Sequence, residues 1–261
     1  MMKAERPSSP KTVRILTYNV HSCIGTDRRL DIDRIAAAIA ETGADIIGMQ
    51  ELDVGRARTG GVDQAHAIAS KLRMDAHFHP ALHVREERYG DAVLTALPMK
   101  LIRAAGLPSI GEPRGALWVE IDAHGTPLQL INTHLGLRRG ERLAQVEALL
   151  GPDWLSHPDY SSAHRLLIGD FNSIPSSPAY RRLAAEIADV QPPVLRHRAT
   201  FPSRFPVFRL DHIFASRGLA CTQAQVIETS LARRASDHLP LVASFALPDA
   251  RAAEQKEETR G

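Results

Sequence analysis

The chain has 261 residues, of which 44% are hydrophobic, and its 32 basic side chains nearly balance its 30 acidic ones. That length and apolar content suffice for one large buried core, so we exclude a disordered chain. The sequence pI of about 8.7 permits a polyanionic partner, but no Lys/Arg cluster of the kind that forms a nucleic-acid-binding arm is present.

The termini and the cysteines indicate one intracellular domain. Cys23 and Cys221 lie far apart without CxxC spacing, which favours a reducing compartment, and we expect a cytoplasmic protein. The N-terminal residues contain no apolar segment typical of a signal peptide, and no apolar run is long enough for a transmembrane segment. We expect flexible tails over 1–11 and 248–261 and a single domain over 12–247.

The first part of the chain predicts alternating strands and helices. A β-type run over 13–20 precedes Asp31, which is suited to cap a helix that ends at Gly43. Ile32, Ile35, Ala36 and Ile39 follow the apolar spacing of a helix in that segment. A strand is expected over 44–50 and a second helix over 62–72.

The remainder predicts mostly strands. Short connections with Pro or Gly separate runs that indicate hairpins, over 91–97, 100–106, 115–122 and 127–134. A helix over 138–150, a strand over 164–169 and a helix starting at Ser177-Pro178, with Ile187 on its inner face, follow. The last strands are expected over 210–216, 221–228 and 239–246. This order predicts two packed sheets with helices outside.

Polar residues adjoin the ends of six of these predicted strands. They are Asn19 and His21, Gln50 and Glu51, Asn132 and His134, Asp170 and Asn172, Asp211 and His212, and Asp237 and His238. Any one pair could satisfy backbone groups in a turn. Turn chemistry favours Gly, Pro and Ser as much, however, so six such ends together indicate a shared site.

The side chains in this set restrict the chemistry. Carboxylate and amide oxygens are hard ligands that suit Mg²⁺, with Mn²⁺ as the alternative, whereas zinc prefers more His and Cys. A His beside an Asp is typical of general acid–base catalysis. Together these groups suit the attack of water on a phosphate ester.

Seven segments carry a resemblance to a known family. TYNVH, MQE, YGDAVLT, INTHL, GDFN, LDHIF and SDHLP, in this order over about 12–246, resemble the endonuclease/exonuclease/phosphatase family. That family includes abasic-site endonucleases, DNase I-like nucleases, neutral sphingomyelinases and inositol polyphosphate 5-phosphatases. The resemblance implies an α/β fold of the DNase I-like type, a four-layer sandwich in which helices flank two packed mixed β-sheets.

The resemblance also implies a role for each matching metal-site residue. Glu51 resembles the principal metal ligand, Asn19 its partner, and Asp237 an acid near the metal. We expect Mg²⁺ at this site, and a carboxylate on a cation stays ionised.

The resemblance further implies the catalytic groups. Asp170 resembles the residue that positions or deprotonates the attacking water, and Asn172 a donor to the scissile phosphate. His238 resembles the catalytic histidine and Asp211 the acid that orients it, whereas His134 resembles a second histidine near the leaving group. Whether Asp170 or His238 takes the proton from water stays open.

Five further residues are candidates for substrate contacts or for local structure. Arg114, before a strand, could reach a substrate phosphate or lie exposed at a turn. Arg56 and Arg58, in a Gly-rich loop, could bind an anionic group or be solvated. Asn132 is assigned to substrate binding, and Asp91 is expected to hydrogen-bond locally.

The sequence leaves three functions open. We favour a Mg²⁺-dependent phosphodiesterase that acts on a small or lipid-derived phosphodiester. The alternative is a nuclease of the abasic-site type; the near-neutral charge, the 5% aromatic content and His134, where abasic-site endonucleases have Tyr, count against it. The third is a catalytically silent binding module, which the presence of all the expected catalytic residues disfavours. Protein partners and oligomeric state are not predicted.

Overall fold

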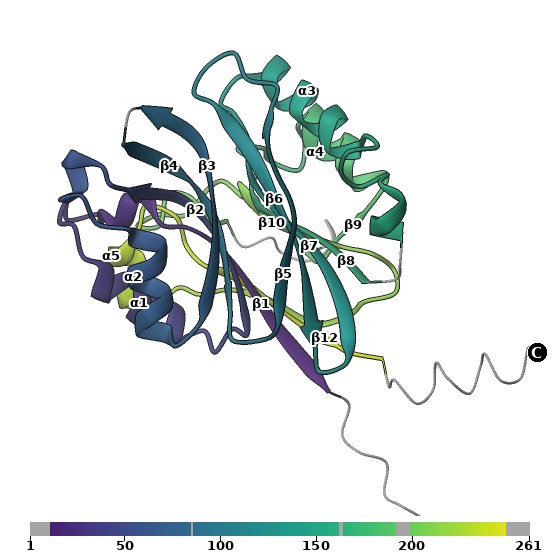
Figure 1. Ribbon diagram of the computed structural model, residues 1–261, viewed down its shortest axis with the longest axis horizontal. Coiled ribbons are helices and arrows are strands. Elements are labelled where there is room, and N and C mark those ends of the chain that lie inside the picture. Colours follow the sequence, from purple (N-terminus) through teal and green to yellow (C-terminus); the bar gives the residue numbers. More distant parts are fainter. Residues whose placement is uncertain (1–10, 85, 162–163, 192–198, 249–261) are drawn as a thin grey trace, which may run out of the picture.

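Two six-stranded mixed sheets form the centre of the fold, and helices lie on the outer side of each sheet (Figure 1). This computed structural model describes residues 11–84, 86–161, 164–191 and 199–248, so nearly all of both predicted tails lies outside the described residues. The predicted four-layer α/β sandwich is confirmed. Within the described ranges, no helix has the length and apolar character needed to cross a bilayer.

The first sheet combines the chain's beginning and end. Its strand order is β11 (Ala220–Val226), β12 (Leu241–Ala246), β1 (Thr12–Asn19), β2 (Ile46–Val54), β4 (Glu87–Thr95) and β3 (Asp75–Val84). The strands β1 and β2 are parallel, and their other neighbours are antiparallel. Helices α1 (Ile32–Ala40), α2 (Gln64–Leu72) and α5 (Ser230–Ala235) cover its outer face (Figure 1).

The second sheet is built from the middle of the chain. Its order is β5 (Met99–Leu107), β6 (Arg114–Ala123), β7 (Thr126–His134), β8 (His164–Asp170), β10 (Asp211–Ala215) and β9 (Ala188–Asp189). Here β7 and β8 are the parallel pair. Helices α3 (Arg139–Leu150) and α4 (Pro178–Ala184) lie over its outer face (Figure 1), and the short helices η1 (His21–Cys23), η2 (Ala57–Thr59) and η3 (Pro158–Ser161) lie in connections.

The central strands are apolar on both faces because each sheet is covered twice. In β1, Ile15 faces the core between the sheets, whereas Leu16 packs under the outer helices. In β8, Ile168 likewise faces the core between the sheets, and Leu167 packs under the outer helices. The predicted helix starts are confirmed, since the Asp31 side chain accepts a hydrogen bond from the backbone N–H three residues later.

Several predicted elements differ from the observed ones. The structure adds β3, which the sequence reading missed because Pro80 interrupts it; the strand lies at the sheet edge and is irregular beside that proline. The connection from β4 to β5 is not a hairpin, since it crosses from one sheet to the other. Helix α4 ends at Ala184, so Ile187 is buried beyond it, and the short elements β9 and α5 were not predicted.

Topology brings the polar strand ends together. Parallel strands end at the same edge, so Asn19 of β1 lies beside Gln50 of β2, and His134 of β7 lies beside Asp170 of β8. Asp211 pairs with Asp170 where β10 begins antiparallel to β8. The two parallel pairs therefore deliver their ends to one rim of the sandwich.

Asn132 joins the two sheets beneath this rim. Its Nδ2 donates to the carbonyls of Met49 and Ala92, at 3.0 Å each, and its Oδ1 accepts from Gln50 Nε2 at 2.7 Å. A Cβ on Gly48 would lie 2.9 Å from Asn132 Oδ1, so this close approach requires glycine. The structure therefore assigns Asn132 to the joint between the sheets and corrects its predicted role in substrate binding.

We expect Asn132→Ala to lower the free energy of unfolding by at least about 3 kcal/mol. The change leaves three buried polar partners without Asn132, and each such group costs roughly 1–3 kcal/mol. Chemical denaturation measures the loss, with Gln223→Ala on the exposed face of β11 as the control. A loss no greater than that of the control would contradict the proposed joint.

Candidate active site

Asp170 lies at the centre of the site and is almost completely buried at the end of β8. Its Oδ1 accepts from the backbone N–H of Asn172 at 2.8 Å, and its Oδ2 accepts from Asn19 Nδ2 at 3.0 Å. The Nε2 atoms of His134 and His238 lie 3.4 and 3.6 Å from the same Oδ2. Four of the predicted site residues thus surround one carboxylate.

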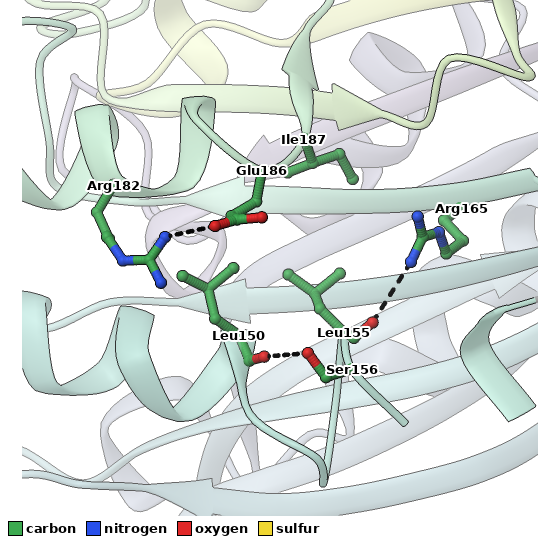
Figure 2. Close-up of a pocket in the computed structure, with 7 residues that line it drawn as sticks. All are labelled: Leu150, Leu155, Ser156, Arg165, Arg182, Glu186 and Ile187. Carbon is green, nitrogen blue, oxygen red and sulfur yellow. Dashed lines mark hydrogen bonds and ion pairs between the residues drawn. The ribbon is translucent and has the colours of Figure 1, made fainter. Parts of the chain in front are cut away.

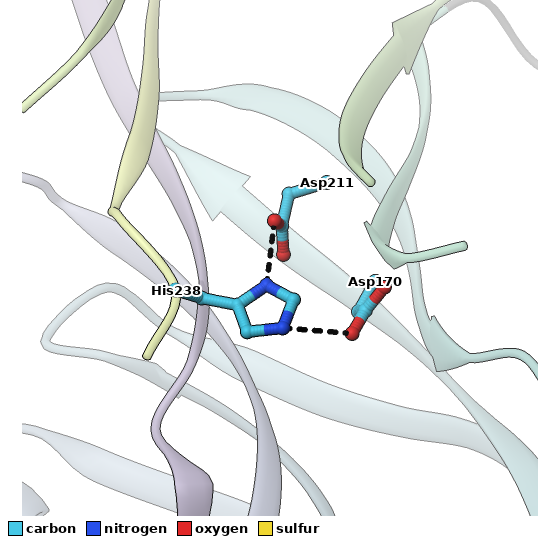
Figure 3. A group of neighbouring side chains, drawn as sticks. All are labelled: Asp170, Asp211 and His238. Carbon is cyan, nitrogen blue, oxygen red and sulfur yellow. Dashed lines mark hydrogen bonds and ion pairs between the residues drawn. The ribbon is translucent and has the colours of Figure 1, made fainter. Parts of the chain in front are cut away.

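His238 connects Asp170 to a second buried acid (Figure 3). Its Nδ1 lies 2.8 Å from Asp211 Oδ2, and its Nε2 faces Asp170. Burial alone would lower the pKa of His238, but the charges of Asp211 and Asp170 outweigh it and raise the pKa above its ordinary value. Burial raises the pKa of Asp170, against the opposing charge of His238. The geometry thus favours a protonated imidazole between two acids.

Glu51 reaches the site through a distortion of β2. The pairing of β2 with β4 shifts register between Met49 and Leu52, and Glu51 has a φ of 63°, which non-glycine residues rarely adopt. Its Oε1 accepts from Asn19 Nδ2 at 2.9 Å. The side chain is 22% exposed, whereas Asp170 is buried, so Glu51 forms the solvent side of this pair of carboxylates.

Asp91, expected to hydrogen-bond only locally, supports this distortion. It is buried in β4, and its carboxylate hydrogen-bonds the backbone of Glu51. Burial raises the pKa of Asp91 to about 8, and the charges of Glu51 and Asp170 add to this, although Arg114 opposes it. An acid directly before the apolar run over 92–94 was the signal that the sequence offered for this role.

Arg114 determines the state of His134. Arg114 is buried, with Nη1 3.0 Å from His134 Nδ1 and 2.9 Å from Glu112 Oε1. A guanidinium only donates, so Nδ1 must accept and the ring proton lies on Nε2. Asn172 Nδ2 lies 3.1 Å from Nε2 and could also donate to the ring, but a neutral ring has only one acceptor nitrogen. The charged Arg114 is the stronger donor of the two, so Nδ1 is the acceptor.

The neutral state of His134 agrees with its surroundings. Burial, with the positive charges of Arg114 and His238, holds the pKa of His134 well below its ordinary value. Its Nε2–H therefore faces Asp170 and Glu51 as a fixed hydrogen-bond donor. Arg114 is buried against His134 and is not the exposed turn residue that the sequence allowed.

Two sets of side chains could hold a metal ion. Asp170, Asp211 and His238 each offer an atom, all within 4.8 Å of one another. His238, however, already bridges the two acids in its protonated form, which has no free lone pair. Glu51, a partly exposed carboxylate that accepts a hydrogen bond from Asn19, and the side-chain oxygen of Asn19 form an oxygen set that fits a hard cation better.

The other predicted residues lie around this centre. Asp237 is partly exposed at the rim, with Oδ1 3.8 Å from His21 Nδ1. Arg56 is not a free loop cation, since it lies 3.5 Å from the buried carboxylate of Asp53, which also accepts two hydrogen bonds from Arg58. The structure therefore anchors the Gly-rich loop through Asp53, which the sequence reading missed.

His212 belongs to a neighbouring network and not to the site. Arg209 contacts both Asp189 and His212 Nδ1, so by the same reasoning His212 carries its proton on Nε2. That Nε2 lies 2.7 Å from the carbonyl of Ser173 and donates to it. The network thereby fixes the chain just after Asn172, and this positions the GDFN segment.

A cavity elsewhere in the fold is separate from this chemistry (Figure 2). It has a volume of about 220 Å³ and is lined by Leu150, Leu155, Ser156, Arg165, Arg182, Glu186 and Ile187. Arg165 lies near the start of β8, at the opposite end from Asp170. Arg182 donates to Glu186 within the cavity wall. The cavity therefore lies apart from the residues around Asp170.

Comparison with known proteins agrees with the geometry. Residues 16–238 match the model of the Endonuclease/Exonuclease/phosphatase family. The chain belongs to this family. Members are phosphoric ester hydrolases, so the protein hydrolyses phosphate esters.

Individual similarities span most of the chain. The "Uncharacterized protein YbhP" of Escherichia coli K12 is 28% identical over 255 residues, covering 90% of this chain and 96% of the relative. The human Nocturnin catalytic domain superimposes with a TM-score of 0.67 at 22% identity, covering 92% of this chain and 94% of that one. The mannosyl-6-phosphatase Bt3783 of Bacteroides thetaiotaomicron superimposes with a TM-score of 0.70 at 17% identity, covering 90% of this chain and 100% of that one. These structures show the family fold.

We expect Asp91→Asn to stabilise the metal-free protein increasingly as pH rises. The folded protein retains the Asp91 proton up to about pH 8, whereas the unfolded chain releases it near 3.8, so wild-type stability falls across this window. The relative gain of the variant has a limiting slope of about 1.4 kcal/mol per pH unit. Denaturation in EDTA at pH 4 to 9 measures it, with exposed Asp75→Asn as the control. Parallel pH profiles for wild type and Asp91→Asn would contradict this role.

We expect Arg114→Gln to release the His134 ring from its single tautomer. A glutamine amide can either donate or accept, so it no longer obliges Nδ1 to accept, and ¹⁵N NMR should show both tautomers where wild type shows the proton on Nε2. Turnover should fall about 10–100-fold, as is usual when an orienting partner is lost. Arg114→Lys, which carries donors and no acceptor, should restore the wild-type spectrum. An unchanged His134 spectrum in Arg114→Gln would refute the assignment.

Proposed function

We propose that the protein is a divalent-metal-dependent phosphodiesterase that acts on a small or lipid-derived phosphodiester in the cytoplasm. The observation that carries the proposal is the convergence on buried Asp170 of His134, His238 and the Asn19–Glu51 pair. It joins a general base, a cationic donor, a neutral donor and hard oxygen ligands within one site. The attack of water on phosphorus requires groups of these kinds.

We assign the water-derived proton to Asp170. The raised pKa of His238 favours its imidazolium, which cannot accept a proton, and the raised pKa of Asp170 makes this carboxylate a stronger base than an ordinary aspartate. Attack forms the new bond from the water oxygen to phosphorus and breaks the bond to the ester oxygen; the leaving oxygen takes a proton from solvent, and Asp170 returns its proton to solvent. Asp211 stabilises the cation of His238 throughout.

Donors on both sides of Asp170 suit the charge of a phosphate ester. His238 Nε2–H and His134 Nε2–H lie on either flank, and either can hydrogen-bond a phosphoryl oxygen or the leaving oxygen. We place His134 near the leaving group. Asn172 Nδ2 lies 2.9 Å from the carbonyl of Leu135, so one of its amide hydrogens is used and the other is a candidate donor to phosphate.

Glu51 and Asn19 would hold the metal ion, which we propose to be Mg²⁺ or Mn²⁺. When bound, the ion supplies positive charge that polarises the phosphoryl group. Asn19 Oδ1 now accepts from the backbone N–H of His21 at 3.0 Å, so its amide would have to rotate to present oxygen. Asp237 is the outer acid of this group, and Arg114 acts on the substrate only through His134.

The experiment is a hydrolysis panel with Mg²⁺ or Mn²⁺. It should contain bis-p-nitrophenyl phosphate, glycerophospholipids, sphingomyelin, inositol phosphates and abasic DNA. A sugar phosphate should be added because one structural neighbour is a mannosyl-6-phosphatase. We expect diesters to be preferred and EDTA to abolish turnover. Full activity in EDTA would overturn metal dependence, and a preference for abasic DNA would establish the nuclease alternative.

Asp170→Asn and His238→Asn should each lower turnover by roughly 10²–10⁴-fold on the best substrate of the panel. Asp170→Asn is nearly isosteric but replaces one acceptor oxygen by a donor, and His238→Asn keeps a polar amide in a smaller side chain; both changes remove the titrating group. Asp75→Asn, on the exposed edge strand β3, is the matched control and should be fully active. A folded Asp170→Asn protein with near-native turnover would disprove the assigned base.

A further inference from the structure

Several large apolar side chains face solvent on loops at the catalytic end of the sandwich. Phe205 is 80% exposed, Leu137 72%, Ile110 71% and Val207 66%. Folding ordinarily removes such side chains from water, so exposed apolar groups gathered around one site indicate an interaction surface. These four lie on three different loops, and each loop is anchored to the catalytic residues.

Two of the apolar tips lie on the His134 side. The backbone N–H of Ile110 donates to Glu141 Oε1 at 2.9 Å, and Arg142 Nη1, on the same helix α3, donates to the carbonyl of Leu137. Both loops are therefore tied to the start of α3. The chain between His134 and Leu137 is held in turn by Leu135, whose N–H donates to the carbonyl of Asp170 at 2.9 Å.

The other tips lie on the His238 side. The loop over 201–208 is held by Ser203, whose N–H donates to the carbonyl of Asp237 at 2.6 Å. The ring of Phe201 lies 4.8 Å from that of His238. Phe205, Val207 and Phe208 project from this loop, each of them exposed.

We call these exposed side chains, together with Ile174 just after Asn172, the apolar rim. Its members are Ile110, Leu137, Ile174, Phe205, Val207 and Phe208. Exposed arginines stand beside the most prominent tips: Arg138 and Arg139 follow Leu137, and Arg204 precedes Phe205. Apolar tips flanked by cations match the two layers of an anionic lipid surface, its acyl boundary and its phosphates.

We propose that the apolar rim docks the enzyme onto an anionic phospholipid membrane, with the catalytic carboxylates facing the lipid phosphates. This inference rests on the proposed function, because it names the physical form of the substrate. A protein partner or a second copy covering the rim would also cover Asp170 and separate it from any substrate. A bilayer is the occupant that covers the rim and supplies phosphate esters at the same time.

Vesicle sedimentation in EDTA tests docking without any turnover. The probes are vesicles of phosphatidylcholine alone and vesicles with 30% phosphatidylglycerol. We expect wild type to sediment with the anionic vesicles, and 0.5 M salt to weaken this binding. Phe205→Glu and Leu137→Glu should each weaken it at least about 10-fold. The control is Leu101→Glu, which has the same charge change at an exposed leucine near the far end of β5 and should bind as wild type does.

Three outcomes would overturn the proposal. Wild type could fail to sediment, the control could lose as much binding as the rim variants, or light scattering could show a wild-type dimer that Phe205→Glu dissociates. Hydrolysis of bis-p-nitrophenyl phosphate separates this result from the proposed function, because Phe205→Glu should leave that soluble activity unchanged. If wild type binds vesicles but hydrolyses no ester, docking stands and the proposed function fails.

Discussion

The burial of Asp170 is the constraint on which the rest of the site depends. A carboxylate removed from water is costly unless charges and donors compensate it. Here the compensation comes from separate parts of the chain: His238 with its supporting acid Asp211, His134 with its supporting cation Arg114, and Asn19 shared with Glu51. The same contacts that make burial tolerable place a base, two donors and oxygen ligands around one point, so stability and chemistry have a common origin.

The two histidines illustrate how neighbouring charge gives one residue type two functions. His238 lies between two acids, which favour its cation, whereas His134 lies against Arg114, which requires a lone pair and therefore a neutral ring. Both rings are buried, so the difference comes from their partners and not from their exposure. A site with one charged and one neutral donor can contact two phosphate oxygens of different charge without excess positive charge accumulating in its interior.

Strand pairing carries this arrangement into the fold. Asn19 and Glu51 come from the parallel pair of one sheet, and His134 and Asp170 come from the parallel pair of the other. Asn132 fastens these pairs across the core, so the distance between the two halves of the site depends on its hydrogen bonds to β2 and β4. The distorted backbone at Glu51, supported by Asp91, then turns one carboxylate outward toward solvent. Above them lies the apolar rim, which we propose faces a lipid surface.

The sequence alone predicted most of the strands, the helix starts at Asp31 and Ser177, and a set of polar residues at strand ends. Apolar periodicity and capping residues are local signals, and the polar ends converge because two parallel pairs end at the rim where the antiparallel strands β10 and β12 begin. Only the tertiary structure decided which polar residues face substrate. Asn132 and Arg114 resembled exposed candidates, but one joins the sheets and the other orients His134. Pro80 spoke against a strand in the sequence, but β3 lies at the edge of its sheet, where a proline is tolerated. These outcomes depend on contacts between residues distant in sequence, which no local pattern encodes.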